Sequence, residues 1–490
     1  MNWTLIVFIV YFLFMFGIGL YFYRRSSNMS DYFLGGRQLN SWVTAMSAQA
    51  SDMSGWLLMG LPAAAYISGM SGAWIAIGLG IGTYLNWKFI AKRLRKFTAV
   101  SGDSITIPEY LQNRFRSKST VVRAICAVII FVFFLVYTAS AFSAGATLFQ
   151  HVFGLDYVLS LTIGAFIIIS YTFLGGFLAV SWTDFFQGIL MFFAIVIVPV
   201  IAVFRTPDFS WELLNQIGGE GYTNLFGGVT PVAIASGLAW GLGYFGMPHI
   251  LTRFMAIKSS SMIKKSRIIA MIWVVISLCA AVFVGLAGHA YLNSIGVSYP
   301  DAKAAEVVFM DLVIKLVPAI LGGVFLSAIM AAVMSTADSQ LLVTASAVTN
   351  DLYKPLFRKN AKDKELMWVS RGSVLLIAVI AYLIALNPNS SVMDLVSYAW
   401  AGFGAAFGPV ILFSLFWKRM TLKGAVAGMT TGGIVIVAWQ TIPVFVATGV
   451  YSLIPGFILA SIAVVVGSLL DKAPSKDIVS IFDKAREADI

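Results

Sequence analysis

The sequence predicts an all-helical protein that crosses a membrane many times. Hydrophobic residues make up 59% of the chain and charged residues only 11%, whereas soluble proteins are about 25% charged. Long uncharged runs recur from end to end, and basic residues gather between them on one side of the resulting layout. These observations exclude a soluble enzyme, a secreted disulfide scaffold and a disordered chain.

An apolar helix needs about 20 residues to cross the hydrocarbon core of a bilayer. The segments between the apolar windows are too short for a soluble catalytic domain. The first window should remain as a span, because it lacks the basic segment and cleavage site of a signal peptide. The thirteen predicted spans are 3–23, 40–68, 71–91, 121–149, 157–175, 183–204, 230–256, 267–293, 317–345, 366–386, 392–417, 424–445 and 451–470.

The basic residues predict the orientation of these spans, because Lys and Arg are enriched in cytoplasmic loops. With the N-terminus outside and the C-terminus in the cytoplasm, all but three of the 33 Lys and Arg residues fall on the inner side; the exceptions are Arg205, Lys303 and Lys315. The net charge of +11 therefore reflects topology and gives no reason to expect nucleic acid. On the inner side, residues 104–114 should form a short surface helix or loop, and the tail 472–490 a solvated segment of mixed charge.

The second predicted span contains a polar interruption near its middle. A carboxylate at membrane depth costs about 2.5–3.5 kcal/mol, and Ser, Asp and Gly stabilise non-helical backbone. We interpret the interruption as an unwound segment that lines an ion or solute site; the alternative is a buried Asp that pairs with a neighbouring helix for structure alone. The polar and small residues are Gln49, Ser51, Asp52, Ser54 and Gly55.

The seventh predicted span is interrupted by four glycines and a proline between residues 236 and 249. Both residue types weaken helices. Trp240, Tyr244 and Pro248 recur every four residues and so share one helical face. Large aromatic residues opposite small ones predict a cavity wall; the alternative is close helix packing through the glycines.

These two interruptions lie five spans apart, so their helices should cross the membrane in opposite directions. Paired broken helices in inverted repeats are the best sequence indication of a transporter's binding site. We therefore predict an extra helix and inner loop over 1–39, a first repeat of five helices over 40–204, and a second repeat of five helices over 205–417. Two further helices and a cytoplasmic tail occupy 418–490.

The ninth predicted span suggests a site for a small cation. Ser335 and Thr336 are adjacent hydroxyl residues, and the carbonyl of Ala332 lies one helical turn earlier. An ion beside this helix could contact all three oxygens, together with carbonyls from the interrupted second span, because hard monovalent cations prefer such neutral oxygen ligands. The alternative is that both hydroxyls bond to their own helix.

At these residues the chain resembles the sodium/solute symporter family over nearly its whole length. The run GGFLAVSWTDFFQ by itself matches the broad family, and the segments around the two interruptions match the branch that transports proline. Met247 stands where that branch would have Gln. The segments that carry the resemblance are YFLGGR (32–37), SAQASDMSGWLLMGLP (47–62), FLGGFLAVSWTDFFQG (173–188), WGLGYFGMPHILTRFMA (240–256), AAVMSTADSQLL (331–342) and LVSYAWAGFGAAFGPV (395–410).

The resemblance implies the leucine-transporter type of fold, with a five-plus-five core and flanking helices, and it implies roles for individual residues. Asp52 and Asp184 would be important for sodium coupling, with Asp338 as a further acid beside the ion or its exit path. The implied sodium ligands are the carbonyls of Ala50, Met53 and Ala332 and the hydroxyls of Ser335 and Thr336. The implied proline pocket contains Tyr137, Trp240, Tyr244 and Pro248, with Ser54 and Gly55 beside it.

The expected function is sodium-coupled import of L-proline across the cell membrane by alternating access, without enzymatic chemistry. The co-transported ion would be Na+, and no organic cofactor or obligatory protein partner is expected. Aromatic faces suit the ring and the cationic nitrogen of proline, and a broken helix can offer amides to its carboxylate. Another solute such as pantothenate, coupling to protons, a channel and a transporter-like sensor are the alternatives.

Overall fold

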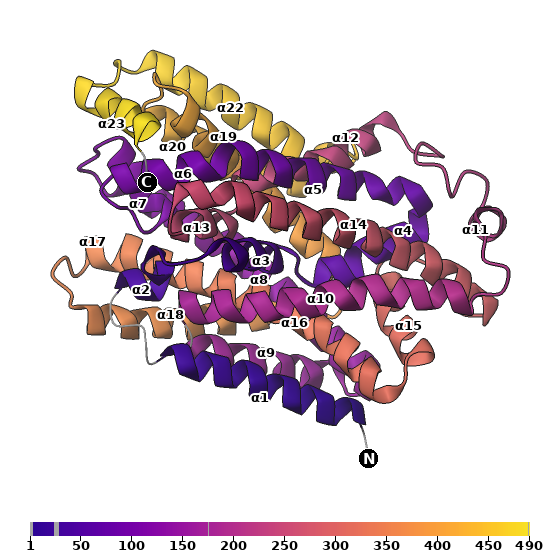
Figure 1. Cartoon of the computed structure of the whole chain (residues 1–490). Coiled ribbons are helices and arrows are strands. Elements are labelled where there is room, and N and C mark those ends of the chain that lie inside the picture. Colours follow the sequence, from indigo (N-terminus) through magenta and orange to yellow (C-terminus); the bar gives the residue numbers. More distant parts are fainter. Residues whose placement is uncertain (1–2, 24–28, 175, 489) are drawn as a thin grey trace.

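The computed structural model describes residues 3–23, 29–174, 176–488 and 490, which form a bundle of long helices (Figure 1). Within these residues there is no β-strand; Leu39 and Ile257 form an isolated parallel bridge. Arg24 and Arg25, which contribute to the predicted orientation, lie outside the described residues.

Except for the basic residues 92–100, which extend beyond the third window, the long helices follow the apolar windows of the sequence. They are α1 (Trp3–Tyr23), α5 (Ala73–Leu85), α6 (Ala91–Val100), α8 (Val121–Phe153), α9 (Tyr157–Leu174), α10 (Phe177–Arg205), α14 (Ile263–Ser294), α16 (Ala319–Ser346), α18 (Asp363–Ala385), α19 (Val392–Phe416), α20 (Leu422–Thr441) and α22 (Leu453–Leu470). Shorter helices connect them: α2 (Met29–Leu34), α7 (Ile107–Arg114), α11 (Trp211–Gly218), α15 (Val308–Leu316), α17 (Lys354–Leu356), α21 (Pro443–Val446) and α23 (Lys476–Glu487).

The multi-span helical architecture is confirmed. Among the described residues, 10 helices are long and apolar enough to cross a membrane, and shorter apolar helices occupy Tyr157–Ser170 and Pro231–Phe245, where the fifth and seventh spans were predicted. One continuous stretch, Trp56–Val100, contains parts of two predicted spans, because the 3-10 turn at Gly69–Gly72 links α4 (Leu61–Ser68) to α5 without a gap. The number thirteen and the orientation of the termini stay predictions.

Two helices are broken, as the polar and glycine-rich interruptions predicted. The first consists of α3 (Ser41–Asp52), the π-helical turn η2 (Trp56–Gly60) and α4. The second consists of α12 (Pro231–Ala239), the 3-10 helix η5 (Trp240–Phe245) and α13 (Pro248–Ala256). We call the non-helical residues 53–54 the first break, and residues 246–247 with the adjoining η5 the second break.

The two broken helices run antiparallel. Leu39, just before α3, bridges to Ile257, just after α13. At the opposite end, the amide of Met70 after α4 donates to the carbonyl of Tyr222 before α12, at 2.8 Å. The start of one broken helix therefore lies beside the end of the other.

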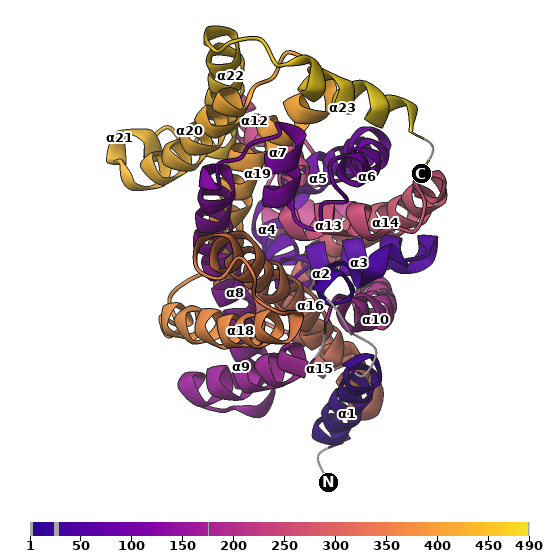
Figure 2. The ribbon, with the colours of Figure 1, turned by 90° about the vertical axis from the view of Figure 1, so that its left-hand side faces the viewer.

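The broken helices occupy the middle of the bundle. Viewed from the end that carries α7 and α23, α3, α4 and α13 are central, whereas α1 and the α20–α22 pair lie on opposite flanks (Figure 2). Helix α1 packs on α10 and α16, and α20 packs on α19 and α22. We name the two ends after their surface helices: the α7/α23 end, and the α11/α15 end, where the chain begins (Figure 1).

The tail expected to be solvated instead packs on the bundle. Helix α23 has an apolar face, on which Phe482 lies against Phe97 of α6 with ring centroids 5.4 Å apart. Arg114 of α7 is buried, donates to the carbonyls of Ser414 and Ile478 and covers the Phe482 ring. The expectation was wrong because the charges of the tail lie on one face of an amphipathic helix.

Candidate functional site

The first break leaves backbone oxygens without helical partners. Asn40 caps α3 by accepting hydrogen bonds from the amides of Trp42 and Val43, and the helix ends at Asp52. Met53 then has φ −79° and ψ 76°, outside the helical region. The last four carbonyls of a helix have no intrahelical donor, so carbonyls near residue 50 are available to other groups.

One of the two adjacent hydroxyls of α16 contacts one of these carbonyls. Ser335 Oγ donates to the carbonyl of Ala50 at 2.7 Å and to the carbonyl of Ala332 at 3.2 Å. The shorter of these two bonds joins α16 to α3. The Ser335 hydroxyl therefore bonds to another helix as well as to its own. Thr336 Oγ1 is buried without a hydrogen-bond partner among the described residues.

The structure thus brings three of the five predicted ion ligands, Ala50, Ala332 and Ser335, into direct contact. Met53 is the first non-helical residue of the first break, and Thr336 follows Ser335 in α16. All five residues are buried. The carbonyl oxygens of Ala50 and Ala332 both lie within hydrogen-bond distance of the Ser335 hydroxyl, and neutral oxygens of this kind are what a small cation prefers.

Asp52 joins the first break to the second. Tyr244 of η5 donates its hydroxyl to Asp52 Oδ2 at 2.6 Å, and Trp56 Nε1 donates to the Asp52 carbonyl at 3.1 Å. Asp52 and Tyr244 are both buried. The carboxylate is therefore paired with a hydroxyl from the other broken helix, as the structural alternative expected, and the same bond joins the two breaks.

Aromatic rings gather around the second break. Trp240 stacks on Tyr451 with ring centroids 5.2 Å apart and an interplanar angle of 17°. Trp400 of α19 donates to the Trp240 carbonyl at 2.8 Å and meets the Tyr244 ring edge-on at 5.0 Å. These contacts fix the orientation of both predicted substrate-binding rings.

The glycines of the second broken helix serve close packing, the alternative considered from the sequence. A Cβ atom on Gly78 of α5 would collide with the carbonyl of Gly237, and one on Gly82 with Gly241. The aromatic residues meanwhile contact α19 and the chain before α22. Both interpretations therefore apply, on different faces of the same segment.

A cavity of about 520 Å³ connects this aromatic cluster with the α11/α15 end. It lies between the start of α5, α12 and the chain that links α20 to α22, and its residues include Ser68, Ser71, Trp74 and Ser236. Trp240 and Tyr451 also line it. Their stacked rings therefore lie between this cavity and the buried Asp52–Tyr244 pair.

The remaining predicted pocket residues surround the breaks without lining that cavity. Tyr137 of α8 is buried beside Asp52 and Ser54, and its ring lies 6.2 Å from that of His249. Pro248 begins α13 and faces a second, smaller cavity toward the α7/α23 end. Gly55 packs closely against Ala144, where a Cβ atom would approach to 2.9 Å.

A buried ion pair anchors the second broken helix. Arg253 of α13 donates to Asp184 Oδ2 of α10 at 3.0 Å and to Ser47 Oγ of α3 at 3.0 Å. The same guanidinium donates to Ser339 Oγ of α16 at 2.5 Å. Arg253 and Asp184 are both fully shielded from solvent, so this pair ties four elements together.

Sequence reasoning missed three residues of this region. Arg253 was counted on the inner side as a residue at the end of a span, and its ion pair with a buried carboxylate was not foreseen. Asp184 was the available signal, since a carboxylate within a span requires a partner. Trp400 and Tyr451 gave no signal of their own, because aromatic residues are common in apolar spans and at their ends.

Asp338 lies one residue before the serine that Arg253 contacts. Its Oδ1 atom is 3.5 Å from Ser339 Oγ, and its Oδ2 atom is buried without a hydrogen-bond partner in the described part of the chain. Ser339 Oγ in turn donates to the Ser335 carbonyl at 2.8 Å. The acid therefore adjoins both the ion pair and the hydroxyl residues of α16.

Solved structures of transporters share this architecture. A Na+-coupled sialic acid symporter in its substrate-bound outward-open state matches with a TM-score of 0.81 and 20% identity, over 97% of this chain and 99% of that chain. MhsT in complex with L-phenylalanine matches with a TM-score of 0.53 and 14% identity, over 87% and 97%. The chain therefore has the multi-pass helical fold of these leucine-transporter-type structures.

Sequence comparison identifies the family. Residues 32–432 match the model of the Sodium:solute symporter family. The sodium/proline symporter of Haemophilus influenzae is 48% identical over 99% of this chain and 98% of that protein, and the sodium/proline symporter of Escherichia coli is 49% identical over 98% and 96%. An osmoregulated proline transporter of Bacillus subtilis is 46% identical over 96% of both chains. The chain belongs to the sodium:solute symporter family.

Proposed function

We propose that the protein imports L-proline together with Na+ across the cell membrane by alternating access. The observation that carries this proposal is the contact between Ser335 and the Ala50 carbonyl beside the first break, in a chain nearly half identical to sodium/proline symporters. The proposal includes thirteen spans, an external N-terminus and a core of two inverted five-helix repeats.

Sodium is cargo in this proposal, and five neutral oxygens would hold it. These are the carbonyls of Ala50, Met53 and Ala332 and the hydroxyls of Ser335 and Thr336. The unpartnered, buried Thr336 hydroxyl supports the assignment, because a buried hydroxyl without a partner costs free energy unless a ligand satisfies it. Ser335 would turn its hydroxyl proton away from the Ala50 carbonyl and offer an oxygen lone pair to the ion.

Proline would bind between the two breaks. Tyr137, Trp240 and Tyr244 supply aromatic faces for its ring and its cationic nitrogen, a contact worth about 0.5–2 kcal/mol. Pro248 closes the pocket on the side of the α7/α23 end, and Ser54 and Gly55 place amides of the first broken helix nearby. The short Asp52–Tyr244 bond would keep one of these rings in place.

Coupling follows from the elements that sodium would join. An ion held by Ala50 and Ser335 fastens α3 to α16, and it favours the conformation in which these elements are close. A ligand shifts a conformational equilibrium only by its difference in affinity for the two states. The membrane potential adds about 2.3 kcal/mol per charge for each 100 mV.

The three acids would have separate tasks. Asp52 connects the two breaks through Tyr244, and Asp184 holds the second broken helix through Arg253. Asp338 precedes Ser339, which accepts a hydrogen bond from Arg253 and donates one to the Ser335 carbonyl. In this arrangement the acids hold the broken helices in place around the ion, while neutral oxygens contact it.

The larger cavity supports an outward-facing form under the proposed orientation. A space of about 520 Å³ reaches Trp240 from the α11/α15 end, whereas the cavity that Pro248 lines on the other side measures about 20 Å³. Substrate would enter through the larger cavity once Tyr451 moves off Trp240.

Uptake of radiolabelled proline into proteoliposomes tests the proposal. An inward sodium gradient should drive accumulation, and replacement of sodium by choline at constant pH should abolish it. Uptake that persists in choline and follows a proton gradient would refute sodium coupling. Unlabelled proline, pantothenate and other amino acids serve as competitors of the labelled proline. A compound that inhibits uptake at a far lower concentration than unlabelled proline does would refute proline as the main substrate.

A further inference from the structure

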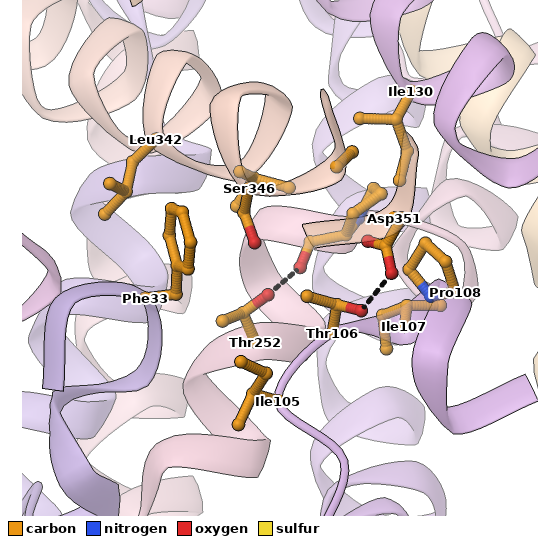
Figure 3. A pocket seen from close by; sticks show the side chains of 13 residues that line it. Phe33, Ile105, Thr106, Ile107, Pro108, Ile130, Thr252, Leu342, Ser346 and Asp351 are labelled. Carbon is orange, nitrogen blue, oxygen red and sulfur yellow. Dashed lines mark hydrogen bonds between the residues drawn. The ribbon is translucent and has the colours of Figure 1, made fainter. Parts of the chain in front are cut away.

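A small cavity separates the second break from the α7/α23 end (Figure 3). Its volume is about 20 Å³, enough for about one water molecule. It begins at Pro248 and Thr252 of α13, passes Leu342 and Ser346 of α16, and ends at Asp351. A solute that leaves the pocket past Pro248 would meet this point first.

Asp351 closes the far end of the cavity. It lies in the π-helical turn η8 (Ala347–Tyr353) that follows α16, and its side chain is completely buried. Its Oδ1 atom accepts a hydrogen bond from Thr106 Oγ1 at 3.1 Å and from Arg123 Nε at 2.9 Å. The π-helical turn matters because such turns often occur at functional positions of helices.

The partners of Asp351 come from two other elements. Arg123 belongs to the first turn of α8. Its Nη2 atom lies 3.2 Å from Oε1 of Glu109 in α7. Thr106 caps α7, because its hydroxyl oxygen accepts the Glu109 amide at 3.1 Å, while Glu109 Oε2 accepts the amide of Ile105 at 2.9 Å. Asp351 therefore holds α7 directly through its capping residue Thr106, and Arg123 bridges Asp351 to Glu109.

Residues 105–108, which lead into α7 and begin its first turn, form the cover of the cavity. Ile105, Ile107 and Pro108 line the cavity beside Thr106, and Phe33 of α2 lies opposite them (Figure 3). Pulling Thr106 away from Asp351 would remove these apolar side chains together, since they are its neighbours in the chain. One polar contact thus controls an apolar closure.

We propose that Thr106, Glu109, Arg123 and Asp351 form an inner latch that must open before cargo passes from Pro248 to the cytoplasm. Asp351 is its central positioning residue and contacts no cargo. The proposal deepens the alternating-access function proposed above and rests on it for the direction of release.

A charged latch has two distinct states. While the latch is closed, Asp351 and Arg123 are shielded from bulk water, and they attract each other more strongly than they would in water because the surrounding medium has a lower dielectric constant. Once the latch separates, water hydrates both charges and the attraction falls. The latch therefore has a closed, shielded state and an open, hydrated state, which suits a gate between two conformations.

A reporter cysteine tests this latch. In a chain carrying C126A and C279S, S346C places a thiol in the cavity beside Asp351. Inside-out vesicles expose the α7/α23 end, under the proposed orientation, to a membrane-impermeant maleimide. We expect Asp351→Asn to speed alkylation of the reporter by about fivefold or more, because a weaker latch populates the open state.

Two further variants guard against misfolding and unspecific effects. Thr106→Val preserves the shape of Thr106 and removes only its hydroxyl, so it should still speed alkylation by about twofold or more. Asp363→Asn, an exposed acid at the start of α18, is the matched control and should leave the rate unchanged. Equal rates in the Asp351 and Thr106 variants and the control would overturn the latch.

The assay needs no transport, so it separates the two proposals. If native protein fails to accumulate proline but Asp351→Asn still speeds alkylation, the latch stands and the substrate assignment fails. If proline accumulates normally in the native protein and neither latch variant changes alkylation, the latch fails and the transport function stands.

Discussion

The two breaks differ in what they offer to a ligand. The first break is short and polar, and it exposes backbone oxygens next to Asp52 and Ser54. The second break includes the 3-10 helix Trp240–Phe245 and is rich in glycine and aromatic residues. The same device, an interrupted membrane helix, thus presents backbone oxygens at the first break and aromatic faces at the second, which are the proposed ion ligands and the proposed walls of the solute pocket.

The difference has a physical origin in the two sequences. Ending a helix at Asp52 leaves carbonyls that need a hydrogen-bond donor or a cation from elsewhere in the protein, because the membrane interior supplies none. In the second broken helix, Gly237 and Gly241 let α5 approach at backbone distance, so its remaining face must carry the large side chains. The carbonyls of the first break therefore suit the proposed sodium ion, and the aromatic side chains of the second break suit the ring of the proposed substrate.

The largest expected effect tests what anchors the second break. Asp184→Asn leaves Arg253 buried with its charge uncompensated, which should cost about 3–5 kcal/mol of the free energy of unfolding and abolish uptake. Thermal unfolding in detergent and proteoliposome uptake measure both. The double variant Asp184→Asn with Arg253→Gln removes the buried charge and should recover much of the stability; a double variant as unstable as the single one would contradict this account.

A smaller effect is expected when the wall of the second break is removed. Trp240→Ala should raise the proline concentration for half-maximal uptake about 30-fold, which corresponds to about 2 kcal/mol of lost contact. The sodium concentration for half-maximal uptake should change little. Trp240→Phe keeps an aromatic face and serves as control. Large losses of both proline and sodium affinity would indicate general disruption of the protein. They would contradict the separate roles proposed for the two breaks.

The smallest expected effect concerns the oxygens at the first break. Thr336→Ala removes one of five proposed ligands and should raise the sodium concentration for half-maximal uptake about fivefold, or about 1 kcal/mol. Thr336→Ser keeps the hydroxyl and should behave like the native protein. Ser335→Ala should have the larger effect of the two alanine variants, because Ser335 also contacts Ala50. If the sodium dependence of uptake is unchanged in both alanine variants, the proposed sodium site is wrong.

The breaks themselves could be predicted because they violate a strict rule. A carboxylate such as that of Asp52 is costly in a membrane helix, and glycines clustered with a proline weaken a helix, so their presence in apolar windows is informative without any structure. The hydroxyl pair of α16 was weaker evidence, since Ser and Thr often bond to their own helix. Its contact with Ala50 became visible only when α3 and α16 were placed side by side.

Other features could not be predicted because the relevant partners lie far apart in the chain. Arg253 and Asp184 are separated by 69 residues, and Asp351 is 228 residues from Arg123. A basic residue near the end of a span has the same local sequence whether it faces the cytoplasm or a buried carboxylate. The apolar face of α23 was likewise hidden behind the charges of the tail.

The sequence by itself determined the helical membrane class, the positions of both interruptions and the residue types available there. These follow from local composition, because a bilayer rejects polar backbone and charge at every depth. Only the tertiary structure decided which carbonyl meets Ser335, which cation neutralises Asp184 and which rings cover the second break. Those choices depend on how separate helices pack, and packing joins residues that local sequence cannot relate.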